Sequence, residues 1–231
     1  MTVAYKIDRI AGETLALMPP PHGFPVEPTA WWVPLTVLGA NGATVAGVQD
    51  LSGNNRHLGE FGPGGKTLAD DGLNRYAVLN TTHTQRLQIA ETLTTPATVV
   101  GLTRVPAAAN ANLIQVGGYM IQRAQVSTRL TVMDVGKTST QYTRLENAGT
   151  GWVLWAAVLN GAASSLRTYA GASVGAGTLV GDGTTGQTHI AANSTATPVH
   201  VAELAILPGA LATAQVTTAL ETVAARHRAL L

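Results

Sequence analysis

From residue 30 onward the chain is built of short apolar runs, and no helical repeat of apolar residues appears before about residue 210. The runs are rich in Val, Ile, Thr and Trp, and segments of Gly, Asn, Asp and Pro separate them. This pattern is typical of antiparallel strands joined by turns. The runs cover residues 31–38, 43–48, 76–80, 86–89, 98–105, 113–121, 128–134, 142–146, 152–160, 165–170 and 199–207. Because no helices alternate with the strands, a βαβ architecture is excluded. The sequence predicts an all-β, two-sheet antiparallel sandwich, with residues 171–196 as edge strand and loop.

The two ends of the chain differ from this central region. Residues 1–29 hold prolines at 19, 20, 21, 25 and 28, which exclude a regular helix and favour an extended N-terminal arm. The arm either packs along its own sandwich or docks on a neighbouring subunit. We therefore divide the chain into an arm, residues 1–29, and a sandwich domain, residues 30–231.

The C-terminus is the one region with helical periodicity. After Pro208 and Gly209, apolar residues recur at helical spacing. They are Val216, Ala219, Leu220, Val223, Ala224 and Leu230. Arg226, His227 and Arg228 fall in the last turn, where cations suit the helix dipole. The sequence predicts one C-terminal α-helix with one face on the sandwich.

The charge content limits the partners of the chain. Charged residues make up 12% of the sequence, against about 25% in ordinary soluble domains. The net charge of +1 and the lack of Lys/Arg clusters argue against nucleic acid as a partner. The low charge reflects either the codon usage of a GC-rich genome or a surface that lies against other subunits of an assembly. We see no signal peptide and no apolar run long enough for a membrane helix, so we expect a chain made in the cytoplasm.

Four segments, in this order, carry a resemblance to a known family. The first is Trp31-Trp32 followed by the D-x-S-G-N-x-x-H-L turn that begins at Asp50, and the second is the pair of runs 75–80 and 96–102. The third is the W-x-x-x-A-x-V-x-N-G hairpin from Trp152 to Gly161, where Asn-Gly is a type I′ turn signal. The fourth is the run 199–207 before the terminal helix. Together these segments resemble the concanavalin A-like lectin/glucanase superfamily, in particular its laminin-G-like modules, which implies a jelly-roll sandwich.

The resemblance directs attention to two groups of residues as a glycan site or a structural turn. The turn contains Asp50, Ser52, Asn54 and Asn55. Asp50 and Ser52 are expected to cap their own backbone while Gly53 and Asn54 adopt left-handed φ. Trp152 and Trp155 are candidate sugar platforms, although aromatic residues of sandwiches mostly fill the core.

Catalytic and metal-binding patterns are not evident. Glucanases of the superfamily place two carboxylates on one strand, whereas Asp134, Glu146 and Glu203 are single acids, which we expect to be exposed or singly paired. The six histidines lack the short spacings of zinc sites, and the chain has no cysteine. Asp50 with Asn54 and Asn55, or Asp70 with Asp71 and Asn74, would suit Ca²⁺, but an ordinary loop explains each cluster better. We expect no cofactor and no enzyme activity.

The resemblance implies three settings in which such a module could function. The first is a phage virion, where the chain would be a minor tail protein near the tail tip that contacts other virion proteins, itself as a homo-oligomer such as a trimer, and a host-surface glycan. The second is a capsid decoration or head-fibre protein. The third is a free, lectin-like carbohydrate-binding module. The lack of a signal peptide, the proline-rich arm and the low charge favour the virion.

Overall fold

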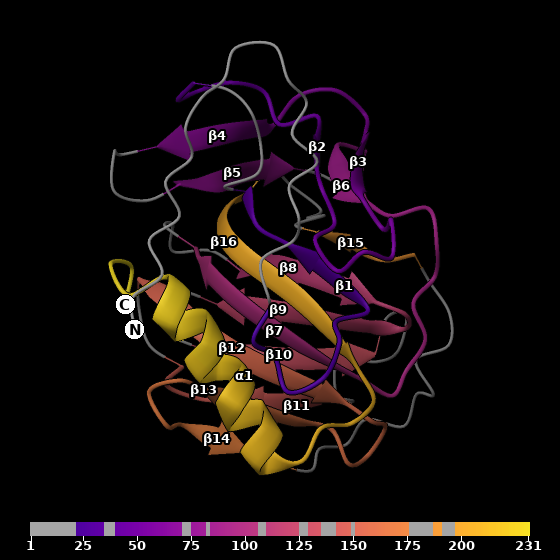
Figure 1. Ribbon diagram of the computed structural model, residues 1–231, viewed down its shortest axis with the longest axis vertical. Coiled ribbons are helices and arrows are strands. Elements are labelled where there is room, and N and C mark those ends of the chain that lie inside the picture. The colour runs from indigo at the N-terminus through magenta and orange to yellow at the C-terminus, as the bar shows by residue number, and fades with distance from the viewer. Residues whose placement is uncertain are drawn as a thin grey trace.

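Two antiparallel eight-stranded sheets stack face to face, and one helix covers the outer side of the first (Figure 1). The computed structural model describes residues 22–34, 40–70, 75–81, 84–105, 110–124, 129–134, 142–148, 151–175, 187–190 and 197–231. The predicted all-β, two-sheet jelly-roll sandwich with one C-terminal helix is confirmed. Of the predicted arm, residues 1–21 lie outside the described residues.

Sheet A carries the helix. Its strand order is β14-β13-β12-β7-β16-β5-β4, and β1 also pairs with β16. The strands are β1 (Ala30–Trp32), β4 (Lys66–Asp70), β5 (Arg75–Thr81), β7 (Ala97–Arg104), β12 (Trp152–Leu159), β13 (Ser165–Thr168), β14 (Ser173–Val174) and β16 (Thr197–Pro208). The long strand β16 lies between β5 and β7 and shifts register between Val201 and Glu203.

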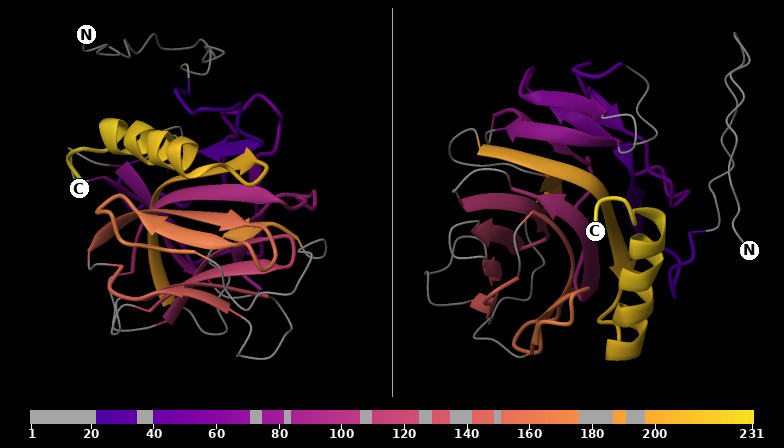
Figure 2. Two further views of the ribbon diagram at one scale, coloured as in Figure 1. Left: turned by 90° about the horizontal axis from the view of Figure 1, so that it is seen from below. Right: turned by 90° about the vertical axis from the view of Figure 1, so that its left-hand side faces the viewer.

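Sheet B forms the second layer. Its strand order is β11-β10-β9-β8-β15-β6-β3-β2. The strands are β2 (Gly47–Val48), β3 (Leu58–Phe61), β6 (Arg86–Gln88), β8 (Asn110–Val116), β9 (Tyr119–Ala124), β10 (Arg129–Asp134), β11 (Tyr142–Leu145) and β15 (His189–Ile190). Figure 2 shows the two layers edge-on, with the helix outside sheet A and away from sheet B.

Alternation of side chains along β12 divides the core into two parts. Val153 and Trp155 point between the sheets, whereas Leu154 and Ala156 point to the helix side. Since β12 is apolar on both faces, the strand is covered on both sides.

The helix α1 (Thr213–Arg226) packs its apolar face on β12 and β7. Its buried residues are Val216, Ala219, Leu220, Val223 and Ala224, as the periodicity predicts. Leu230 lies beyond the end of the helix but still packs against the same cluster. No helix in the described part of the chain is both long and apolar enough to cross a membrane.

Several predicted boundaries are wrong, each for a local reason. The single run 113–121 is two strands, β8 and β9, because Gly117 and Gly118 form a tight turn between them. The Asn160-Gly161 turn is longer than a two-residue type I′ turn, since Val158 pairs with Ser165. Strands β3 and β4 are absent from the prediction because their sequences, LGEF and KTLAD, lack a strong β pattern. Of the predicted edge strand and loop at residues 171–196, β14 does lie at the edge of sheet A, whereas β15 lies inside sheet B, between β8 and β6.

Candidate functional site

The turn that begins at Asp50 is bonded to its own chain on every side. Oδ1 of Asp50 accepts hydrogen bonds from the backbone N–H groups of Trp31 and Ser52, both at 2.9 Å. Oδ2 accepts from Ser52 Oγ at 2.8 Å and from the backbone N–H of Arg56 at 2.9 Å. The carboxylate is 4% exposed. With four donors on its two oxygens, it holds β1 in place and offers little to a ligand.

The rest of this turn fastens the segment that enters the sandwich. Asn54 Nδ2 donates to the carbonyl oxygens of Pro28 at 3.0 Å and Thr29 at 3.1 Å. Left-handed backbone was expected at Gly53 and Asn54. It occurs at Gly53, with φ 85°, and at Asn55, with φ 57°, so the expectation for Asn54 is wrong. Asn55 is exposed. The second candidate calcium loop is largely outside the described residues, because residues 71–74 are not described.

The two candidate tryptophans of β12 lie on opposite faces of sheet A. Trp155 is fully buried between the sheets, and its Nε1–H donates to Thr103 Oγ1 at 2.9 Å. Trp155 is therefore a core residue and cannot act as a sugar platform. Trp152, three residues earlier, points to the outer face and is half-buried.

Trp152 belongs to an aromatic cluster on this outer face. Its ring packs edge-on against Tyr76, with centroids 5.0 Å apart and an interplanar angle of 77°. Tyr76 in turn stacks on the His200 ring at 5.1 Å, and the Trp152 and His200 rings are 6.2 Å apart. The three rings come from β12, β5 and β16, and each is only partly buried.

Arg104, at the end of β7, lies in register between two of these rings. It pairs across the sheet with Trp152 on one side and with His200 on the other. In the described part of the chain, no Asp or Glu carboxylate forms an ion pair with it. Burial and, secondarily, the Arg104 charge lower the pKa of His200 below its ordinary value, so this ring is neutral near pH 7. We call Tyr76, Arg104, Trp152 and His200 the aromatic platform.

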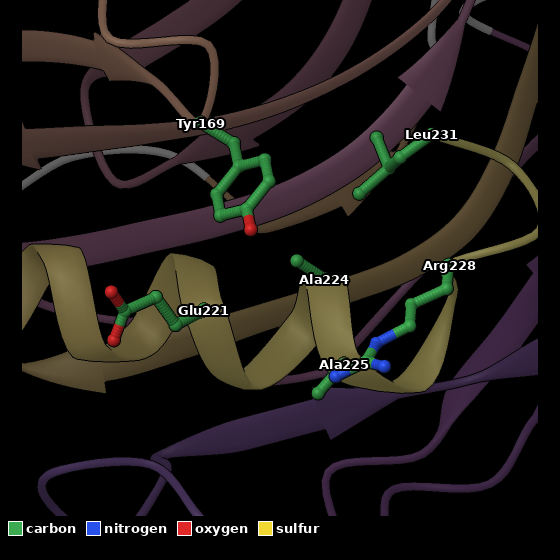
Figure 3. A pocket seen from close by; sticks show the side chains of 6 residues that line it. All are labelled: Tyr169, Glu221, Ala224, Ala225, Arg228 and Leu231. Carbon is green, nitrogen blue, oxygen red and sulfur yellow. The ribbon is translucent and has the colours of Figure 1, made fainter.

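A cleft of about 360 Å³ lies between α1 and Tyr169, the residue that follows β13 (Figure 3). It is lined by Tyr169, Glu221, Ala224, Ala225, Arg228 and Leu231. Tyr169 is 49% exposed and points toward the helix in Figure 3. Its backbone N–H donates to the carbonyl of Leu154 at 2.9 Å, and Leu154 is two residues from Trp152 on the same face. Tyr169, at one wall of the cleft, therefore lies beside β12, the strand that carries Trp152.

Glu203 is the acid that the sequence analysis misjudges most. It is expected to be exposed or singly paired, but it is fully buried and contacts three partner residues. Its carboxylate accepts from Trp31 Nε1 at 2.9 Å, approaches His227 Nε2 at 2.7 Å and forms an ion pair with Arg226. Burial by itself raises the pKa of Glu203, but the contacts with His227 and Arg226 outweigh it and lower the pKa.

The other two single acids also have defined surroundings. Glu146 is exposed and pairs with Arg129 at 2.7 Å, as expected, whereas Asp134 is buried at the end of β10. Across the described ranges, no group of three or more His, Asp or Glu side chains is arranged to hold a metal ion.

Of the four residues of the aromatic platform, the sequence alone indicated only Trp152. Tyr76, Arg104 and His200 are separated from it by tens of residues, and only strand pairing brings them together. One sequence signal pointed to Arg104. Val100, Leu102 and Arg104 are two residues apart along β7 and share one face, so a cation follows two apolar residues on that face.

The comparisons with known proteins give solved structures only, since no family model and no curated protein sequence matches the chain. Domain 4 of AbnA, an extracellular GH43 arabinanase from Geobacillus stearothermophilus solved with arabinotriose, is 17% identical with a TM-score of 0.58. The match covers 84% of this chain and 98% of that one. The receptor-binding domain of botulinum neurotoxin D is 9% identical, with a TM-score of 0.56, over 84% of this chain and 52% of that one.

A sialidase of Trypanosoma rangeli, a mutant with trans-sialidase activity, gives a TM-score of 0.52 at 10% identity. The match covers 84% of this chain but 32% of the sialidase. At these identities the likeness establishes the fold, a two-sheet sandwich.

Proposed function

We propose that this chain is a non-catalytic glycan-binding module whose binding surface is the aromatic platform. The observation that carries the proposal is the partly buried cluster of Tyr76, Trp152 and His200 on the helix side of sheet A, at the edge of the core. An aromatic face packs against the apolar C–H face of a sugar ring, while polar groups at its edge bind the hydroxyls.

The structural neighbours support a glycan ligand. One was solved with arabinotriose, and a botulinum neurotoxin D binding domain was solved with N-acetylneuraminic acid. Both share the sandwich fold, with TM-scores of 0.58 and 0.52. A fold by itself does not fix a ligand, so the proposal rests on the platform and takes the neighbours as support.

The absence of catalysis is part of the proposal. Glycoside hydrolysis generally requires two carboxylates about 5–9.5 Å apart across the scissile bond. The platform brings together three aromatic rings and one cation, and the carboxylate of Glu203 is closed off by Trp31 and α1. We expect no reducing sugar to be released from β-glucans or bacterial cell-wall glycans. Turnover that a single Asp or Glu substitution abolishes would overturn this part of the proposal.

The glycan proposal is tested by replacing the central ring. Trp152→Ala is expected to lower glycan affinity at least tenfold on a glycan array and in calorimetry, because the stacking surface is removed. Tyr142→Ala is the matched control, since Tyr142 is a half-buried aromatic residue beside an arginine, Arg144, on the opposite sheet. Equal loss in both variants, or no loss in Trp152→Ala, would refute the platform as the site.

We further propose that the module works in a phage virion as a minor tail protein near the tail tip, where it meets the host surface. The low charge and the proline-rich residues before position 22 support a chain that lies against other subunits. Mass spectrometry of purified particles should find the chain in tails separated from heads, and light scattering should show a homo-oligomer. Recovery in heads would instead favour a capsid decoration or head-fibre protein. A monomer that is absent from particles but binds soluble glycans would favour a free lectin-like module.

A further inference from the structure

We propose that the aromatic platform selects sugars that carry a carboxylate, with Arg104 as the group that binds it. This inference rests on the proposed glycan-binding function and names the ligand class. On one row of sheet A, Arg104 lies between the partly buried rings of Trp152 and His200, and among the described residues no carboxylate pairs with it.

Arg104 differs from the arginines that serve structural ion pairs. In the described ranges, Arg56, Arg129 and Arg226 each pair with a glutamate. Arg104 has no such partner there, although it is half-buried between the strands that carry Trp152 and His200. Glu203 lies on the same side of β16 but is occupied by Arg226 and His227. A half-buried guanidinium gains more from an anion than one in open water, because screening by solvent is weaker.

The other groups of the platform leave Arg104 as its source of charge. His200 is neutral near pH 7, because burial and the Arg104 charge lower its pKa. Its Nδ1 is buried without a hydrogen-bond partner among the described residues. Tyr76 and Trp152 are uncharged and supply ring surface. The platform therefore combines one fixed positive charge with the surfaces of three aromatic rings.

Geometry favours a carboxylate over other anions. Residues in register on adjacent strands lie about 5 Å apart at Cβ. Arg104 and Trp152 are such a pair, so their side chains extend from neighbouring positions. A sugar ring stacked on the Trp152 ring would hold an equatorial carboxylate at its edge, roughly in its own plane. The planar fork of arginine binds a carboxylate through two parallel hydrogen bonds.

The experiment compares matched acidic and neutral sugars by calorimetry. The pairs are a glucuronic acid disaccharide with its glucose counterpart, and sialyllactose with lactose. The acidic member of at least one pair should bind about tenfold more tightly, as expected for a hydrogen bond to a charged group. The pair that shows the preference separates a uronic acid from a sialic acid as the source of the carboxylate.

Substitution of the cation provides the control. Arg104→Gln should bring the affinity for the acidic sugar down to that for its neutral counterpart, whereas Arg144→Gln on sheet B should keep the preference for the acidic sugar. Thermal melts of both variants verify folding. Equal affinity for acidic and neutral sugars overturns this inference and leaves glycan binding standing, while no binding of any sugar overturns both. Tighter binding of a sugar phosphate than of the uronate overturns the carboxylate assignment.

Discussion

At the scale of single residues, the Asp50 turn shows how local chemistry fixes one conformation. Gly53 has φ 85°, and no atom lies within 4 Å of the position that a Cβ would take, so a side chain there would meet no neighbour. The restriction at this position is therefore in the backbone, not in packing. Asn55, with φ 57°, is a residue type that tolerates the left-handed region.

Gly53→Val should therefore destabilise the fold by about 1–3 kcal/mol, because a β-branched residue is forced into left-handed φ. Thermal or urea unfolding measures the change. Gly175→Val is the matched control, since Gly175 also faces open space but without positive φ, and its melt should shift little. If Gly53→Val melts like the wild type and loses ligand binding instead, the turn is a binding loop.

Glu203 makes the second prediction at this scale. Glu203→Gln should cost about 3 kcal/mol, the low end for breaking a buried ion pair, because Arg226 is partly exposed and can turn to solvent. The folded-state pKa of Glu203 is lowered, so its contribution is complete at neutral pH and is lost as pH falls through the folded pKa. The difference in unfolding free energy between wild type and variant should shrink below about pH 4.3, the ordinary pKa of glutamate. A difference that stays constant down to pH 2 would contradict this assignment.

At the scale of elements, α1 closes the outer face of sheet A. Its residues reach three parts of the fold: Arg226 binds Glu203 of β16, Thr217 accepts from Arg167 of β13, and Thr222 donates to the carbonyl of Gly23. The last turn of the helix was expected to place cations for the dipole. Arg226 and the capping His227 instead bind a buried carboxylate.

Because the apolar face of α1 holds it to the sheet, Leu220→Ala should lower the unfolding free energy by about 2–4 kcal/mol. Leu220 is 2% exposed. Thr218→Ala, an exposed position of the same helix whose hydroxyl bonds back to Ala214, is the control and should change stability by less than about 0.5 kcal/mol. Chemical denaturation followed by tryptophan fluorescence compares the two, and similar losses would show that the helix is not held by this face.

At the scale of the whole molecule, residues 22–29 belong to the sandwich. Phe24 is 6% exposed and packs edge-on against Trp31, with centroids 5.9 Å apart, and the Arg226 guanidinium lies 5.0 Å from its ring. Arg226 also donates to the carbonyl of His22. His22 and Phe24 of the predicted arm therefore pack along the sandwich of their own chain.

A chain that starts at Thr29 should therefore lose about 3 kcal/mol of stability relative to one that starts at His22, because the burial of Phe24 is lost. If residues 1–21 dock on a neighbouring subunit, the chain from His22 should also be a monomer where the full chain is an oligomer. Calorimetry and light scattering on the three chains test both points. An oligomer formed equally by all three would rule out the docking role.

The sequence by itself determined those features that depend on neighbours along the chain. An unbroken apolar run marked β12 as a strand, helical spacing gave the face of α1, and turn chemistry marked Asp50 and Gly53 as a turn. Tertiary structure decided what strand pairing brings together: Trp155 over Gly101, where a Cβ would lie 2.5 Å from the indole, and Trp152 beside Arg104 and His200. It also decided the burial of Glu203. The reason is physical, since register and layer packing join residues far apart in sequence, and no local pattern records which strand will lie beside which.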